Sequence, residues 1–125
     1  MKVMLIANDT TFIYNLRREV LQGLINAGYE VGVVAQILEF RTELEQMGCH
    51  VIGLDTARHG TNPLKDLFLF GKYLRILKAE KPDVVLTNNI KPNVYAGLAC
   101  KMRQIHYISN VTGLGTPVEN PGPIL

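Results

Sequence analysis

Three short polar stretches, each close behind an apolar run, carry the side chains that could bind a ligand. Their members are Asn8 and Thr10, then Asn88, Asn89 and Lys91, and last Thr112 with Gly113. Amide and hydroxyl groups offer hydrogen bonds, whereas Lys91 adds one positive charge. This chemistry suits a polyol, such as a sugar, better than a ligand that needs several positive charges. The alternative for the two consecutive asparagines is that they only form a turn and cap the helix before Pro92.

The stretch NVTGLGTP (110–117) raises the separate question of a phosphate-binding loop. Its two glycines would let backbone N–H groups approach an anion, and a following helix would add its dipole. The chain after Gly115 instead reads TPVENPGPIL, and its prolines oppose a helix. There is no GxGxxG after the first apolar run and no GxxxxGK[ST] anywhere in the sequence. The stretch by itself is therefore weak support for nucleotide binding.

Composition narrows the class of protein. The 125 residues are enough for one domain, 47% of them are apolar, and 13 basic against 11 acidic residues leave a net charge of +2. This balance argues against a nucleic-acid partner. Cys49 and Cys100 stand outside any CxxC spacing and the three histidines are scattered, so we expect reduced thiols, no metal and no cofactor. The first apolar run is too short for a signal peptide or a membrane span, and a cytoplasmic location is expected.

Apolar runs alternate with amphipathic segments along the chain. Strands are predicted at 2–7, 29–35, 50–54, 82–87 and 106–111, and helices at about 11–27, 37–47, 64–80 and 91–103. Strands joined by helices pair in parallel with right-handed crossovers. We therefore predict an α/β fold, a Rossmann-like doubly wound parallel sheet of five strands in the order 3-2-1-4-5.

Ligands of doubly wound sheets bind beyond the carboxyl ends of the strands, where the strand order reverses. Here that point lies between the first and fourth strands, and the three polar stretches follow the first, fourth and fifth strands. We therefore expect them to meet at one edge of the sheet.

The first helix is predicted to be capped by Thr10 or Thr11 and to end at Gly28. Its buried stripe is expected to repeat every fourth residue, as Phe12, Leu16, Val20 and Leu24, widened by Ile13 and Leu21.

The helix at 64–80 is preceded by Asn62 and Pro63, which fit a cap and a first helical position. Its predicted apolar face consists of Leu64, Leu67, Phe68, Gly71, Leu74 and Leu77, with further apolar residues beside it. Lys65, Lys72, Arg75 and Lys78 border this wide face. Peripheral docking to an anionic membrane is one interpretation. The alternative is ordinary burial against neighbouring elements or a further domain.

The order of RHGTNPLKDL, KPDVVLTNNIKPNVYAGLA and HYISNVTGLGT resembles the N-terminal half of family 4 glycosyltransferases, over nearly the whole chain. It is most similar to the bacterial subgroup that assembles capsule, exopolysaccharide or lipid-linked glycans. The resemblance implies a GT-B architecture and transfer of a hexose with retained configuration and without a metal. It also implies that this half binds mainly the acceptor, while a second domain binds the nucleotide-sugar. The residues that we expect to contact the acceptor are those of the three polar stretches, Asn8, Thr10, Asn88, Asn89, Lys91, Thr112 and Gly113.

The sequence departs from many of these relatives in two places. It has NDTTF where they carry a glycine-rich loop after the first strand, and Thr112 where they carry histidine. We expect residues 1–125 to be the N-terminal domain of a longer enzyme and to be inactive alone. The rival hypothesis is a non-enzymatic small-molecule binding module of flavodoxin-like layout.

Overall fold

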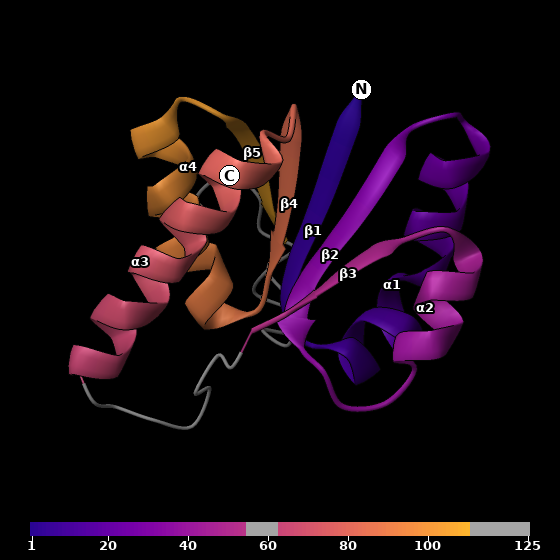
Figure 1. Ribbon diagram of the computed structural model, residues 1–125, viewed down its shortest axis with the longest axis horizontal. Coiled ribbons are helices and arrows are strands. Elements are labelled where there is room, and N and C mark those ends of the chain that lie inside the picture. Colours follow the sequence, from indigo (N-terminus) through magenta and orange to yellow (C-terminus); the bar gives the residue numbers. More distant parts are fainter. Residues whose placement is uncertain (55–62, 111–125) are drawn as a thin grey trace, which may run out of the picture.

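The computed structural model describes residues 1–54 and 63–110, and these form a five-stranded parallel sheet with helices on both faces (Figure 1). The strands are β1 (Lys2–Asp9), β2 (Glu30–Gln36), β3 (His50–Gly53), β4 (Val84–Asn88) and β5 (His106–Asn110). Their order is β3-β2-β1-β4-β5 and every neighbouring pair is parallel. The predicted fold class and strand order are confirmed.

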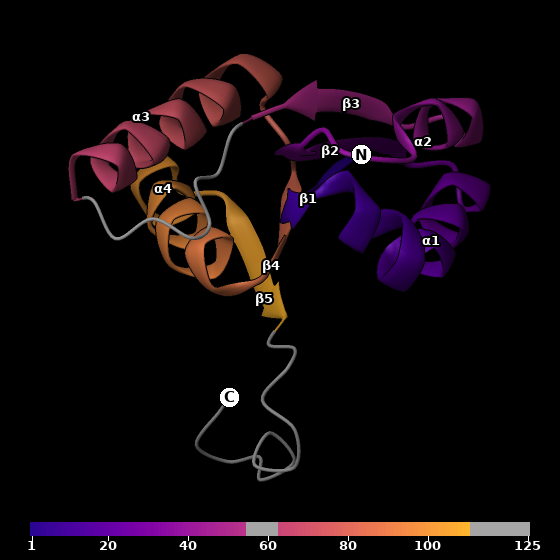
Figure 2. The ribbon, with the colours of Figure 1, turned by 90° about the horizontal axis from the view of Figure 1, so that it is seen from below.

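The helices divide into two layers (Figure 2). The first layer is α1 (Thr10–Asn26) with α2 (Arg41–Met47), and the second is α3 (Pro63–Glu80) with the π-helix η1 (Pro92–Ala96) and α4 (Gly97–Arg103). Right-handed crossovers produce this division, because the chain moves outward from β1 to β3 and then crosses to build β4 and β5 on the other side.

The central strand β1 supplies core residues to both layers. Met4 and Ile6 belong to the cluster under α3, η1 and α4, while Leu5 and Ala7 belong to the cluster under α1 and α2. A run of apolar residues is therefore buried on both sides, as a central parallel strand requires. In the second layer Tyr73 is fully buried, and burial raises the pKa of its hydroxyl.

The start of α1 differs from the prediction. The cap is Asp9, whose Oδ1 accepts a hydrogen bond from the Phe12 N–H (2.8 Å). Because β1 continues to Asp9, this residue is the extended one at the helix boundary, with φ −154°. Thr10 and Thr11 instead accept hydrogen bonds from the backbone after β2, at Leu38 N and Glu39 N. At the other end α1 stops at Asn26, and Gly28 follows with φ +95°.

The predicted stripe of α1 is also wrong in part. Leu16 and Val20 are 59% and 45% exposed, whereas Ile13 and Leu21 are fully buried. Both stripes have helical spacing, and the sheet selects the one that lies directly over β1 and β2.

The apolar face of α3 is shifted in the same way. The buried residues are Leu69, Tyr73 and Leu77, one turn apart, while Leu67 and Phe68 are more than 60% exposed. The apolar arc is wide enough to allow either orientation, and contact with the sheet decides between them. Asn62 lies outside the described residues.

Two further helices differ from the prediction in length or type. The helix expected at 37–47 begins only at Arg41, because Phe40 is left-handed with φ +72°. It ends as predicted at Gly48, with φ +110°. The helix expected at 91–103 begins with a five-residue π-helix before α4.

Candidate functional site

The structure brings the first two polar stretches together at the carboxyl edge of β1 and β4. The backbone N–H of Asn8 donates to Asn89 Oδ1 at 2.9 Å. The pairing of β1 with β2 shifts register between Ile6 and Asp9, the segment that contains Asn8. Such irregularities in a strand redirect side chains and are frequent beside binding sites. The edge therefore holds an amide cluster on an irregular backbone.

Asn88 is fully buried and contacts α1 directly. Its Oδ1 accepts a hydrogen bond from Arg17 Nε at 2.9 Å, and its Nδ2 lies 3.5 Å from the Ile6 carbonyl. Asn88 therefore ties β4 to α1 and β1, which is a structural role beside any contact with a ligand. The same hydrogen bond brings a positive charge, the guanidinium of Arg17, to this edge.

Sequence reasoning missed Arg17, although a signal was present. Arg17 lies one helical turn from both Ile13 and Leu21, so the helical period places a charged residue on the buried face of α1. A charge at such a position needs a polar partner inside the fold. The buried amide of Asn88 is that partner.

Asn89 and the segment after it have unusual backbone geometry. Asn89 has φ +77°, in the left-handed region that asparagine adopts more readily than most residues. Its carbonyl accepts from the Asn93 N–H at 2.9 Å, and the π-helix starts at Pro92. Short π-helical turns and left-handed non-glycine residues both concentrate at functional sites. The turn after β4 is thus the most irregular described segment of the site.

Asn93 is a second residue that sequence reasoning missed. Its Nδ2 donates to the Asn110 carbonyl at 2.9 Å, and so holds the end of β5. Its Oδ1 is buried and has no hydrogen-bond partner among the described residues. Asn93 lies four residues after Asn89, a spacing that places both on one side of a helical turn. Asn93 therefore holds Asn110 at the end of β5, whereas Thr112 and Gly113 lie outside the described residues.

Lys91 points toward α3. Its Nζ lies 2.9 Å from Asp66 Oδ1, and the Tyr95 hydroxyl donates to Asp66 Oδ2 at 3.0 Å. The hydrogen bond from Lys91 lowers the pKa of Asp66, and that of Tyr95 lowers it further. The pKa of Tyr95 is raised, because its hydroxyl donates to the carboxylate. The charge of Lys91 is therefore offset within the chain, and its contact with an acceptor or phosphate stays a prediction.

Thr10 is fully buried, and its hydroxyl accepts from Leu38 N at 2.9 Å. It fixes the segment after β2 against the start of α1. Its predicted contact with a ligand stays a prediction, as do those of Asn8, Asn88 and Asn89.

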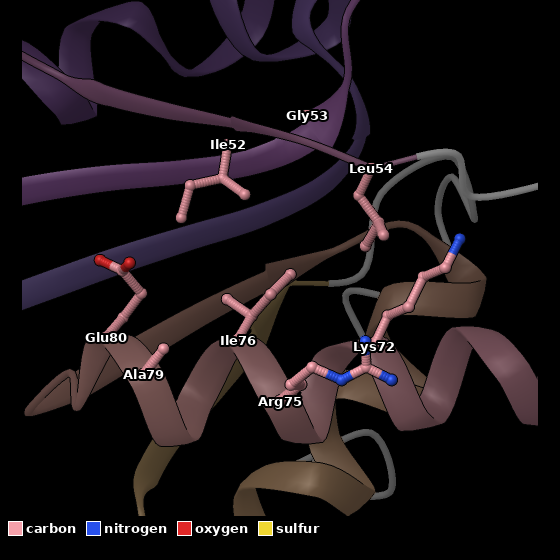
Figure 3. A pocket seen from close by; sticks show the side chains of 8 residues that line it. All are labelled: Ile52, Gly53, Leu54, Lys72, Arg75, Ile76, Ala79 and Glu80. Carbon is pink, nitrogen blue, oxygen red and sulfur yellow. The ribbon is translucent and has the colours of Figure 1, made fainter.

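Two pockets lie on the second layer, and neither is lined by Asn8, Asn88 or Asn89. One, of about 530 Å³, lies between α3 and the end of β3. Ile52 and Leu54 face Ile76 across it, and the basic side chains of Lys72 and Arg75 lie at one end (Figure 3). The other, of about 440 Å³, lies between α3 and α4. Its lining is Pro63, Asp66, Leu67, Phe70, Tyr95 and Leu98. It therefore includes the carboxylate that holds Lys91.

The described residues offer little for metal or thiol chemistry. Within 1–54 and 63–110 no group of three or more His, Cys, Asp or Glu side chains could hold a metal ion. Cys49 and Cys100 are buried free thiols, and burial raises the pKa of each to about 11. In the same part of the chain no helix is long and apolar enough to cross a bilayer.

Comparison with solved structures gives the fold. MurG from Acinetobacter baumannii is 20% identical, with a TM-score of 0.70 over 88% of this chain and 34% of that chain. A glycosyltransferase from Rickettsia africae is 19% identical, with a TM-score of 0.70 over 86% and 29%. UDP-GlcNAc 2-epimerase from Methanocaldococcus jannaschii is 17% identical, with a TM-score of 0.68 over 96% and 34%. The chain thus spans about a third of the length of each of these three structures.

Comparison with family models is more specific. No curated protein matches the chain. The model described as Glycosyl transferase 4-like matches residues 2–124, which is nearly the whole sequence. The chain therefore belongs to the Glycosyl transferase 4-like family.

Proposed function

We propose that this chain is the acceptor-binding domain of a glycosyltransferase that moves a hexose from a nucleotide-sugar to a glycan. The observation that carries the proposal is the amide cluster of Asn8, Asn88 and Asn89 at the carboxyl edge, in a chain of the Glycosyl transferase 4-like family. Doubly wound sheets bind ligands at this switch point. Amides suit an acceptor sugar because each can both donate to and accept from hydroxyl groups.

In this proposal some residues position the edge of the sheet and another contacts the acceptor. Asn88 and Arg17 fix the edge, Asn89 Oδ1 is used by the Asn8 N–H, and the Asn89 amide nitrogen is the donor that we assign to the acceptor. Orientation of a hydroxyl toward the anomeric carbon can supply a large part of the rate enhancement. The nucleotide-sugar is bound in this proposal by a second domain, with no metal and with retention of configuration.

We further propose that the acceptor is a lipid-linked glycan of a capsule, exopolysaccharide or related surface polymer. Such an acceptor would place the enzyme at the cytoplasmic side of the cell membrane. The resemblance of the motifs to that bacterial subgroup supports this proposal, and so does the exposed apolar surface of the second layer.

The test is kinetic, in an enzyme that contains this chain together with a donor-binding domain. Asn89→Gly keeps the left-handed backbone and removes the amide, so kcat/KM should fall about tenfold, as for one or two lost hydrogen bonds. Asn15→Ala removes an exposed amide from α1 and is the matched control. Equal kcat/KM for the two variants would remove Asn89 from the site. Absence of any sugar transfer by the parent enzyme would favour the non-enzymatic binding module.

A further inference from the structure

The two halves of the chain differ strongly in charge. Residues 1–54 carry four Lys or Arg against six Asp or Glu, whereas residues 63–103 carry eight against three. The three acidic groups of the second half are engaged: Asp66 by Lys91, Glu80 by the Lys2 side chain, and Asp83 by the Lys2 backbone N–H. Seven of its eight basic residues, all except Lys91, are exposed. The second layer therefore presents positive charge to its surroundings.

The same layer also exposes large apolar side chains in a regular pattern. Along residues 90–103 every fourth residue is apolar and 48–79% exposed, and the first two turns of α3 add three more. We call this set the apolar face, and its members are Leu64, Leu67, Phe68, Ile90, Val94, Leu98 and Met102. Leu67 and Leu98 line one pocket, so the contributions of the two helices adjoin.

The extent of the stripe indicates what covers it. At 1.5 Å per residue, Ile90 and Met102 lie roughly 18 Å apart along the helix axis. The stripe therefore runs from the carboxyl edge far along the outer surface of the layer. A domain that docks only at the carboxyl edge would leave its far end, Leu98 and Met102, exposed. Lys101 and Arg103, both exposed, adjoin that far end.

We infer that the apolar face docks on an anionic lipid bilayer, with Leu67, Leu98 and Met102 entering the interface and Lys101 and Arg103 contacting lipid headgroups. An apolar stripe flanked by basic residues is the surface that binds such interfaces. The inference rests on the proposed function, because docking on the bilayer would bring the domain to a lipid-linked acceptor. The sequence alone raised docking only for the helix at 64–80, as one interpretation beside ordinary burial.

The experiment is flotation of the full chain with lipid vesicles, which needs neither donor nor acceptor. Vesicles of phosphatidylcholine with about 30% phosphatidylglycerol should bind the protein at least tenfold more strongly than pure phosphatidylcholine. Binding should weaken as NaCl rises from about 0.1 M to about 0.5 M. Lys101→Glu with Arg103→Glu should remove the preference for anionic lipid.

The matched variants separate this face from exposed apolar residues in general. Leu67→Glu with Leu98→Glu alters side chains that are 64% and 48% exposed, and should abolish flotation. Leu16→Glu with Val20→Glu alters side chains of α1 that are 59% and 45% exposed, and should leave flotation unchanged. Far-ultraviolet circular dichroism checks that both double variants fold.

Three results would overturn the inference. The first is that the parent protein does not float, and the second is that the variant Leu67→Glu with Leu98→Glu still floats. The third is that the parent protein sediments as a dimer that this variant dissociates, because a second copy of the chain would then cover the apolar face. A sugar-transfer assay with a water-soluble acceptor fragment tests the proposed function separately, because docking is not needed there. A parent enzyme that does not float but still transfers sugar to this fragment would therefore reject the docking alone.

Discussion

The two helical layers pack on the same sheet but differ in net charge and in the type of helix that they contain. Each buries an apolar cluster against one face, with Leu21 and Leu44 in the first layer and Tyr73 and Leu77 in the second. The first layer consists of α-helices and belongs to the acidic part of the chain. The second belongs to the basic part of the chain, contains a π-helix directly after the left-handed Asn89, and exposes an apolar stripe along residues 90–103. Because both layers meet the demands of folding equally, the extra features of the second layer point to function.

The largest expected effect tests whether the layers contribute equally to folding. Leu21→Ala in α1 and Leu77→Ala in α3 each remove a side chain that is at most 1% exposed. Each should lower the free energy of unfolding by about 2–5 kcal/mol, through lost burial and the remaining cavity. Urea denaturation followed by circular dichroism measures both. If one substitution left stability unchanged, the layer it belongs to would not be part of a single cooperative core.

The next effect tests the link between α1 of the first layer and β4 at the candidate site. Asn88→Ala removes the acceptor of the Arg17 Nε–H and should cost about 1.5–3 kcal/mol of stability, the range for a hydrogen bond to a charged group. Asn26→Ala is the control, since it breaks a hydrogen bond between Asn26 and Gln22 on the exposed surface. Similar losses for the two variants would show that the Arg17–Asn88 contact is no stronger than a surface hydrogen bond.

A smaller effect concerns pH and belongs to the second layer alone. The pKa of Asp66 is lowered in the folded protein. The carboxylate therefore contributes fully to stability at any pH above the pKa of the unfolded chain, which is about 4. That contribution is lost as the pH falls through the lower, folded value. The Asp66→Asn variant should therefore lose less stability than the parent when acidified below about pH 4. Thermal unfolding between neutral and acidic pH measures this, and parallel curves for the two proteins would contradict it.

The smallest effects come from glycines and sharpen the same comparison. An added Cβ at Gly23 in α1 or Gly71 in α3 would meet nothing within 4 Å, so Gly→Ala at either should stabilise by about 0.5–1 kcal/mol. At Gly97 it would lie 3.1 Å from the Tyr107 ring, which packs α4 against β5. Gly97→Ala should give none of this gain. Equal stabilisation at all three sites in thermal melts would show that α4 can shift away from β5.

Much of the fold could be predicted from the pattern of apolar runs, but side-chain orientation could not. The alternation of strands and helices leads to the parallel sheet and its order, because right-handed crossovers leave few arrangements. The same sequence allowed two stripes on α1 and on α3. Leu16 and Phe68 were expected inside and lie outside, since only contact with the sheet selects the face.

For the candidate site, proximity could be predicted and hydrogen bonding could not. Asn8 and Asn89 were expected to meet because the carboxyl ends of neighbouring parallel strands share an edge, and the structure joins them at 2.9 Å. Arg17 and Asn93 were missed, because their partners Asn88 and Asn110 are distant in sequence. The pairing of Lys91 with Asp66 of α3 was not expected from the sequence, and the contact of Lys91 with a ligand stays a prediction.

The sequence alone determined the α/β class, the strand order and the edge at which polar groups gather, since these follow from apolar periodicity and from the handedness of crossovers. The tertiary structure decided which helix faces are buried, which polar groups pair, and where exposed apolar and basic residues adjoin. The physical reason is that periodicity is a local property of the chain. The charge asymmetry of the halves was present in the sequence from the start, but only the packing of α3 beside α4 brought Leu67 next to Leu98.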